Sequence, residues 1–180
     1  MKTLALLSVM FAVVSSVPIR GADPDITVAI SVLPNRQGER TIEYNGHDPH
    51  FHVIVSNISD KPQKIWREWC SWGYYSLSFE LSDKSGKKWV AKKGMSVWTK
   101  NYPDWSTLKP HESVVIDVYF ADTGMWKGFP CPENGSQTVT MRAIFEIKPD
   151  DWSKKNGVWT GHVASKADKF TFYHWKPETK

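Results

Sequence analysis

Hydrophobic and polar residues alternate, one by one, along several short segments of the chain. In one of them Leu77, Phe79 and Leu81 alternate with Ser78, Glu80 and Ser82. Alternation of this kind places the apolar side chains on one face of a β-strand. No comparable stretch at helical spacing follows the N-terminal segment, so the pattern predicts an all-β protein. The segments that alternate are 26–32, 51–56, 77–82, 114–120, 138–147 and 170–173.

Turn-forming residues separate these predicted strands. The segment 82–87 contains Gly86 between two apolar runs, which predicts a hairpin. The segments 57–62, 108–113 and 130–135 carry Asn, Pro or Gly. Antiparallel strands with one wet face each predict a β-sandwich, here of about seven to nine strands. The Lys- and Asp-rich segment 148–156 is predicted to be an exposed loop. The apolar side of the strands predicts a core of Val53, Val55, Phe79, Ile116, Val118, Val139, Met141 and Phe145.

Three stretches resemble a known kind of domain. Residues 51–62 (FHVIVSNISDKP), 108–113 (LKPHES) and 158–165 (VWTGHVAS) are similar to strand and turn segments of secreted bacterial Ig-like domains of unassigned function. His111 stands where those domains usually carry Gly. The resemblance extends more remotely to the BsuPI-type proteinase-inhibitor domain. It implies an Ig-like antiparallel β-sandwich over residues 25–175, and it transfers no catalytic residue.

The N-terminal segment has the features of an export signal. Lys2 precedes an almost wholly apolar run from Leu4 to Val14, and Ser15 and Ser16 follow. We expect residues 1–16 to be a signal peptide, with an end that extends at most to residue 22; the alternative is a buried N-terminal helix. The run is too short for a membrane span of about 20 residues. Residues 176–180 form a polar tail, so the expected product is secreted or periplasmic, with no membrane anchor.

Length and charge narrow the classes of function. The chain has 180 residues, which corresponds to one ordinary domain behind a signal. Lys and Arg number 23 against 19 Asp and Glu, so the net charge of +4 argues against a strongly basic nucleic-acid-binding protein. The sequence contains no Gly-x-Ser-x-Gly elbow, His-Glu-x-x-His or Gly-rich phosphate loop. We therefore predict a non-catalytic protein without a cofactor.

Tryptophan is the unusual feature of the composition, with 10 residues. Exposed rings can anchor a protein interface or stack on sugars, whereas the simplest alternative is that they cover the ends and edges of the sandwich. We expect the chain to bind a protein partner in the envelope or outside the cell, or to have a structural role there. The alternatives are a proteinase-inhibitor-like module and a carbohydrate-binding module. The candidate binding residues are Trp66, Trp69, Trp72, Trp98, Tyr102 and Trp105.

Two further groups of side chains suggest specific chemistry. Cys70 and Cys131 are the only cysteines, and export favours a disulfide between them. Closing this loop would stabilise the fold by about 4 kcal/mol on the chain-entropy model, and two free thiols are the alternative. His47, His50 and His52 are weak candidates for metal ligands, because imidazoles two apart on a strand share one face. A solvated strand face is the explanation that we favour, and we expect no metal site.

Overall fold

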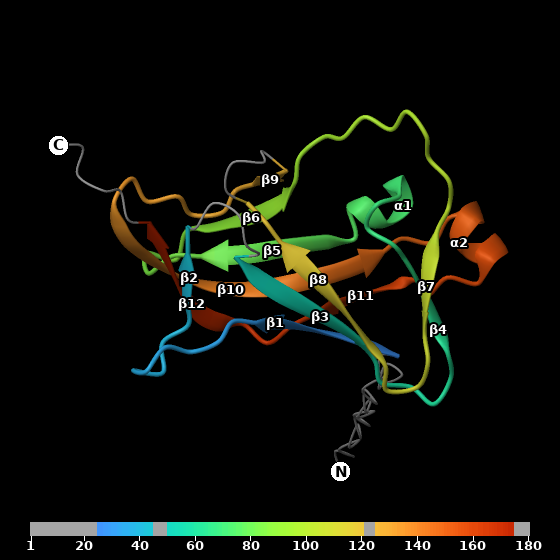
Figure 1. Cartoon of the computed structure of the whole chain (residues 1–180), viewed down its shortest axis with the longest axis horizontal. Coiled ribbons are helices and arrows are strands. Elements are labelled where there is room, and N and C mark those ends of the chain that lie inside the picture. The colour runs from blue at the N-terminus through green and yellow to red at the C-terminus, as the bar shows by residue number, and fades with distance from the viewer. Residues whose placement is uncertain (1–24, 45–49, 121–124, 175–180) are drawn as a thin grey trace, which may run out of the picture.

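The computed structural model describes residues 25–44, 50–120 and 125–174. These residues form twelve β-strands and two short helices (Figure 1). In chain order the elements are β1 (Ile26–Ser31), β2 (Thr41–Glu43), β3 (Phe51–Asn57), β4 (Gln63–Trp66), α1 (Ser71–Tyr74), β5 (Leu77–Ser82), β6 (Lys88–Lys93), β7 (Trp105–Leu108), β8 (Ser113–Val118), β9 (Trp126–Lys127), β10 (Gly135–Ile147), α2 (Asp151–Asn156), β11 (Gly161–Ala164) and β12 (Asp168–His174).

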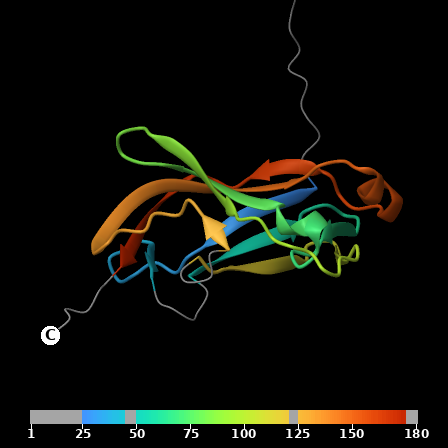
Figure 2. The same cartoon turned by 90° about the horizontal axis from the view of Figure 1, so that it is seen from above.

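The strands form two main layers and one small sheet. The first layer is a three-stranded antiparallel sheet in the order β1-β3-β8. The second is a seven-stranded sheet in the order β2-β12-β10-β5-β6-β9, in which β11 also pairs with β10. Strands β4 and β7 form a separate two-stranded sheet. Figure 2 shows the two main layers stacked face to face.

The hydrophobic core lies between the two main sheets. Phe51 of β3 meets Phe79 of β5 with ring centroids 5.4 Å apart, so side chains from opposite layers are in direct contact. All eight residues predicted for the core are buried, which confirms the strand register. The all-β prediction is confirmed as well, because each of the six alternating segments forms a strand: β1, β3, β5, β8, β10 and β12.

The structure corrects the predicted strand number and one predicted loop. The described residues contain twelve strands rather than seven to nine, because the added strands are mostly too short for visible alternation. Part of the segment 148–156 is helix α2 and not an exposed loop. The Asp150 side chain accepts a hydrogen bond from Ser153 N, and the Ser153 hydroxyl accepts one from Asp150 N, which completes a capping box. Gly157 ends the helix in the left-handed conformation.

Asn57 holds the corner where the three-stranded sheet meets the β4–β7 sheet. Its side chain is fully buried, and its Nδ2 donates to the carbonyl oxygens of Lys61 and Leu108 at 2.7 and 3.0 Å. Its Oδ1 accepts a hydrogen bond from Ser59 N. Nearby, His111 adopts a φ of 63°, in the left-handed region that favours glycine. These contacts hold the corner between the β3–β8 pair and the β4–β7 sheet. The β4–β7 sheet borders the site described below.

No helix in the described part of the chain is long and apolar enough to cross a membrane.

Candidate functional site at the aromatic end

Strands β4 and β7, helices α1 and α2 and the loop 94–104 gather at one end of the molecule (Figure 1). We call this region the aromatic end. It contains all six binding candidates from the sequence and three additional large aromatic residues. Its aromatic side chains are Trp66, Trp69, Trp72, Tyr74, Tyr75, Trp98, Tyr102, Trp105 and Trp152.

Trp66 is the buried centre of the aromatic end. It is only 3% exposed, and its ring lies 5.8 Å from that of Trp72 and 6.2 Å from that of Trp105. Trp72 in turn meets Trp152 of α2 at 5.4 Å. These contacts join β4, β7, α1 and α2 through aromatic packing. Trp66 therefore packs inside the aromatic end, where it lines two cavities rather than forming part of the open surface.

Trp69 is exposed but held in one position. Its side chain is 63% exposed, yet its indole N–H donates to Asp104 Oδ2 at 2.9 Å. The Arg67 guanidinium lies over the ring, 4.8 Å from the centroid, and also pairs with Asp104 at 3.4 Å. Arg67 Nε donates to the Ser106 hydroxyl at 3.1 Å. Both partners of the ring are thus themselves fixed, so Trp69 presents a rigid apolar surface to solvent.

Other apolar side chains extend this exposed surface. Tyr102 is 76% exposed and lies in the loop 94–104, which also exposes Met95 and Val97. Tyr75 and Trp152 are exposed at α1 and α2. Contiguous exposed apolar surface on a monomer marks interaction sites more often than scattered single residues do. The aromatic end is where such residues concentrate in the described part of this chain.

The short helix α1 and the loop 94–104 are attached to each other and to β4. Gly73 of α1 packs directly on the backbone beyond β4, since a Cβ atom there would lie 2.2 Å from the Arg67 carbonyl oxygen. The Asn101 side chain accepts a hydrogen bond from Ser71 N at 3.0 Å and donates to the Ser71 hydroxyl. The exposed aromatic residues therefore stand on a supported frame.

A buried lysine lies beneath this surface. The Lys93 side chain is 4% exposed, and its ammonium lies 4.7 Å from the Tyr74 ring centroid and 5.5 Å from that of Trp126. Its only ion-pair partner among the described residues is Glu68, at 3.4 Å. Burial lowers the pKa of Lys93, and the charge of Glu68 opposes this shift. Burial also raises the pKa of the neighbouring Tyr74 hydroxyl.

Two cavities border the aromatic end. One, of about 380 Å³, lies beside Trp72 and Tyr75 and is lined also by Glu146, Lys148 and Asp150. The other, of about 190 Å³, is more apolar. It lies between the segment 65–69, which begins at the end of β4, and the residues 114–116 of β8, with Phe145 of β10 also in its lining. Ser71 and Ser76 line the larger cavity, where the Ser71 hydroxyl accepts a hydrogen bond from Asn101 and the Ser76 hydroxyl donates one to the Gly73 carbonyl oxygen.

The residues predicted from the sequence include most aromatic side chains of the aromatic end, but the sequence does not show which of them are exposed. Trp72, Trp98 and Trp105 are partly buried, whereas Trp69 and Tyr102 are exposed. Trp152 and the pair Arg67–Asp104 were not among the candidates. A Trp in a predicted exposed loop is a usable signal for Trp152, but nothing in the sequence links Arg67 to Asp104, which lie 37 residues apart.

The predicted disulfide is not formed in the structure, in which both cysteines are free. Cys70 is buried at the start of α1, and its thiol contacts the Arg67 carbonyl oxygen at 3.1 Å. Cys131 is exposed in the connection between β9 and β10, and this connection runs toward the end of the molecule opposite α1 (Figure 1). Glu146 near the end of β10 bonds Ser76 beside α1, so most of the length of β10, about 35 Å, separates the two regions.

The histidine candidates have other contacts in the structure. His52 pairs with Asp117 at 2.8 Å on the outer face of β3 and β8. His50 stacks on Phe120, with centroids 4.1 Å apart. His47 lies outside the described residues. Within the described ranges no group of three His, Cys, Asp or Glu side chains is arranged to hold a metal ion.

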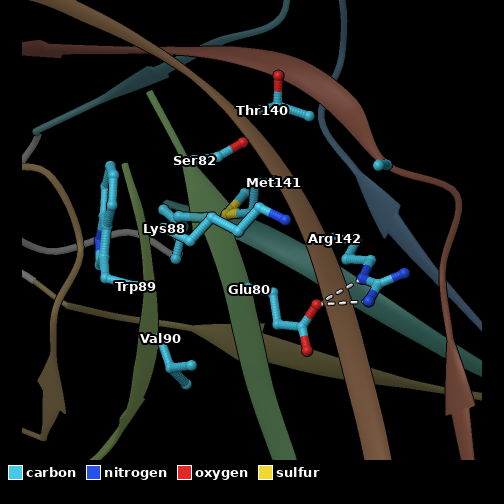
Figure 3. A pocket seen from close by; sticks show the side chains of 10 residues that line it. Glu80, Ser82, Lys88, Trp89, Val90, Thr140, Met141 and Arg142 are labelled. Carbon is cyan, nitrogen blue, oxygen red and sulfur yellow. Dashed lines mark hydrogen bonds and ion pairs between the residues drawn. The ribbon is translucent and has the colours of Figure 1, made fainter. Parts of the chain in front are cut away.

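A cavity of about 570 Å³ lies on the outer face of the seven-stranded sheet. Figure 3 shows Glu80 and Arg142 joined across it, with Lys88, Ser82 and Thr140 nearby. Arg142 Nε donates to Glu80 Oε2 at 2.7 Å, so the two opposite charges satisfy each other. Trp89 donates its indole N–H to the Gly128 carbonyl and packs against the core, which leaves this cavity without a free aromatic platform.

Comparisons of this chain with protein-family models, with curated proteins and with solved structures find no match.

Proposed function

We propose that this chain is a secreted or periplasmic, non-catalytic module that binds a protein partner through its aromatic end. The observation that carries the proposal is the state of Trp69, which is exposed and yet fixed by Arg67 and Asp104. Interface hot spots are enriched in Trp, Tyr and Arg. A ring that is already immobile loses little conformational entropy when it is covered, so it binds more tightly than a mobile one.

The proposal includes an Ig-like sandwich exported by residues 1–16. Its support is the stacking of a three-stranded antiparallel sheet on a larger, mostly antiparallel sheet, together with the turn before β8. His111 has a positive φ at the position where the domains it resembles usually carry Gly. Sandwiches of this kind present loops and strand edges from a rigid core, which suits recognition rather than catalysis.

The pairing of charges supports a role without catalysis. Charged side chains form ion pairs with each other at both sites. Arg67 pairs with Asp104 at the aromatic end, and Glu80 pairs with Arg142 at the cavity on the outer face of the seven-stranded sheet. Catalytic sites instead hold titratable groups so that they converge on a place that substrate can occupy. The exposed apolar area of the aromatic end is better suited to a partner surface.

Affinity capture tests this function. The mature protein, immobilised through its N-terminus, is exposed to an extract of the envelope and medium of the cells that produce it, and retained protein is identified and its Kd measured. We expect Tyr102→Ala and Trp69→Ala each to weaken the Kd at least about tenfold, as truncation of a hot spot does. Tyr173→Ala, an exposed aromatic on β12, is the matched control and should leave the Kd unchanged.

Two other outcomes would contradict the proposal. Equal Kd values for wild type, Tyr102→Ala and Trp69→Ala would show that the partner binds elsewhere. Retention on insoluble polysaccharide, or inhibition of proteases in a panel, in the absence of any retained protein would favour the carbohydrate-binding or the inhibitor function instead.

A further inference from the structure

We propose that the free edge of β8 and the apolar cavity beside it bind one extended segment of the protein partner as an added β-strand. We call this region the β8 groove; it consists of Val114, Val115 and Ile116, the facing segment 65–69 and Phe145. The inference rests on the proposed function, because the groove opens at the aromatic end. It adds the conformation and the chemistry of the segment that is recognised.

One edge of β8 carries main-chain groups that no described strand uses. β8 pairs with β3 on one side, and its other side has no partner in the sheet. Asn57 N donates to Glu112 O at 2.9 Å, which makes these two residues a hydrogen-bonded pair. Since such pairs alternate along an antiparallel ladder, Val114 and Ile116 direct their main-chain groups to β3. Those of Ser113, Val115 and Asp117 therefore point to the open side.

This edge lacks the usual protection against pairing. Exposed edge strands commonly carry Pro or Lys, or are covered by another element. β8 has the sequence SVVIDV, and its central Val115 is 56% exposed. Its one charged residue, Asp117, is engaged with His52 of the neighbouring strand. An open row of donors and acceptors of this kind specifies an extended chain as its ligand.

The cavity supplies a place for one side chain of the added strand. Successive side chains of a strand point to opposite faces, so every second residue of the segment would face the core side of β8. There Val114 and Ile116 lie beside the cavity of about 190 Å³ that Trp66 and Phe145 also line. This space admits a large apolar side chain and gives the added strand a fixed register.

The charges of the groove favour a neutral, apolar segment. Arg67 is paired with Asp104, and Glu68 with Lys93, so the ionic groups of this wall are compensated within the chain. The segment 65–69 faces β8 across the cavity and so bounds the space open to a chain along the edge. In a second copy β8 is paired with β3 and faces its own segment 65–69, so these elements would have to enter with it. A flexible segment carries no such neighbours and is therefore the occupant that fits.

Peptides selected from a library test the groove directly. A phage-displayed library of linear random peptides is selected on the immobilised mature protein, and the peptides obtained are synthesised for NMR. We expect bound peptide to slow amide hydrogen exchange at Ser113, Val115 and Asp117 at least tenfold and to leave Val114 and Ile116 unchanged. Selected peptides that protect none of the first three amides, or failure to select any linear peptide, would overturn the inference.

A proline variant gives a second test. Val115→Pro removes the outward N–H of the edge, a position where strands tolerate proline, and should weaken peptide binding at least tenfold. Val115→Thr keeps this N–H and is the matched control. N-methylation of the peptide is a test that needs no variant of the protein. Methylation of every second amide should abolish binding in one of the two alternating sets and not in the other. Equal effects of the two sets would contradict strand addition.

The failure of this inference is distinguishable from failure of the proposed function. Tyr102 lies outside the β8 groove, so Tyr102→Ala should leave peptide affinity unchanged while it weakens the whole partner. Partner binding that is sensitive to Tyr102→Ala but identical in Val115→Pro and wild type would refute the groove alone. A concentration-dependent dimer of the unliganded protein in sedimentation, lost in Val115→Pro, would show that β8 pairs with a second copy and would also refute it.

Discussion

Lys93 is the residue whose chemistry departs furthest from that of a surface side chain. Its ammonium is buried between Tyr74 and Trp126, and Glu68 is half-exposed. Because burial disfavours the charged form, the pKa of Lys93 in the folded protein lies below the value of 10.5 for an exposed lysine. Between these two pKa values the Lys93 side chain binds more protons in the unfolded chain than in the folded protein, so its contribution to stability rises with pH across that range.

The variant Lys93→Met tests this consequence of burial. In the wild type we expect the free energy of unfolding to rise with pH toward 10.5, and in Lys93→Met this rise should be lost, since methionine does not titrate. Urea unfolding at several pH values measures both curves. Lys92→Met, at the exposed neighbouring position, is the control and should follow the wild type. Curves for wild type and Lys93→Met that run parallel would mean that Lys93 is solvated.

At the scale of elements, α1 depends on one close approach. Gly73 does not have a positive φ, so alanine would meet no backbone strain there. Its added Cβ would nevertheless lie 2.2 Å from the carbonyl oxygen of Arg67, and a backbone atom cannot rotate away as a flexible side chain can. Helix α1 would have to move away from the segment that carries Trp69.

We expect Gly73→Ala to lower the free energy of unfolding by about 1–3 kcal/mol, the usual range for overpacking. Displacement of Arg67 should also free Trp69, so partner binding should weaken although the substitution does not touch the exposed surface. Chemical denaturation and the capture assay measure the two effects. Tyr75→Ala, at the exposed residue that follows the same helix, should change stability little. Unchanged stability in Gly73→Ala would mean that α1 is not packed as described.

For the molecule as a whole, the long strand β10 determines which distant residues can meet. It pairs with β5, β11 and β12 and runs from the connection that holds Cys131 toward the region of α1. A disulfide needs Cα atoms within about 7 Å, so the two cysteines, at opposite ends of this strand, cannot bond without large rearrangement.

Thiol labelling checks this geometry. Mass spectrometry of denatured, unreduced protein should show both cysteines alkylated. In the native protein Cys131 should react at once, whereas buried Cys70 should react only as the fold opens. Cys131→Ser should abolish the fast phase and Cys70→Ser the slow one. A native protein two mass units lighter than the dithiol, with no alkylation, would show that the two cysteines are bonded after all.

The strands that carry the core can be predicted from the sequence alone. Alternation is a local property, so Phe51, Val53 and Val55 indicate both a strand and its buried face without knowledge of its partners. Helix α2 was also readable in part, because Asp150, Ser153 and Gly157 are ordinary capping residues. Its short, mostly polar sequence has no apolar periodicity, and for that reason the pattern predicts a loop there. Strands β4 and β7 have only four residues each, too few for a pattern.

Which aromatic residues form a surface depends on tertiary contacts and cannot be predicted from the sequence alone. Trp66 and Trp69 lie three residues apart in one segment, yet one is buried and the other exposed. The difference arises from residues far along the chain: Trp105 covers Trp66, whereas Asp104 and Arg67 hold Trp69 at the rim. The open edge of β8 has the same origin, because a strand's sequence specifies its faces but not its neighbours. Exposure, pairing and the distance between the cysteines depend on the packing of remote segments, which local pattern does not encode.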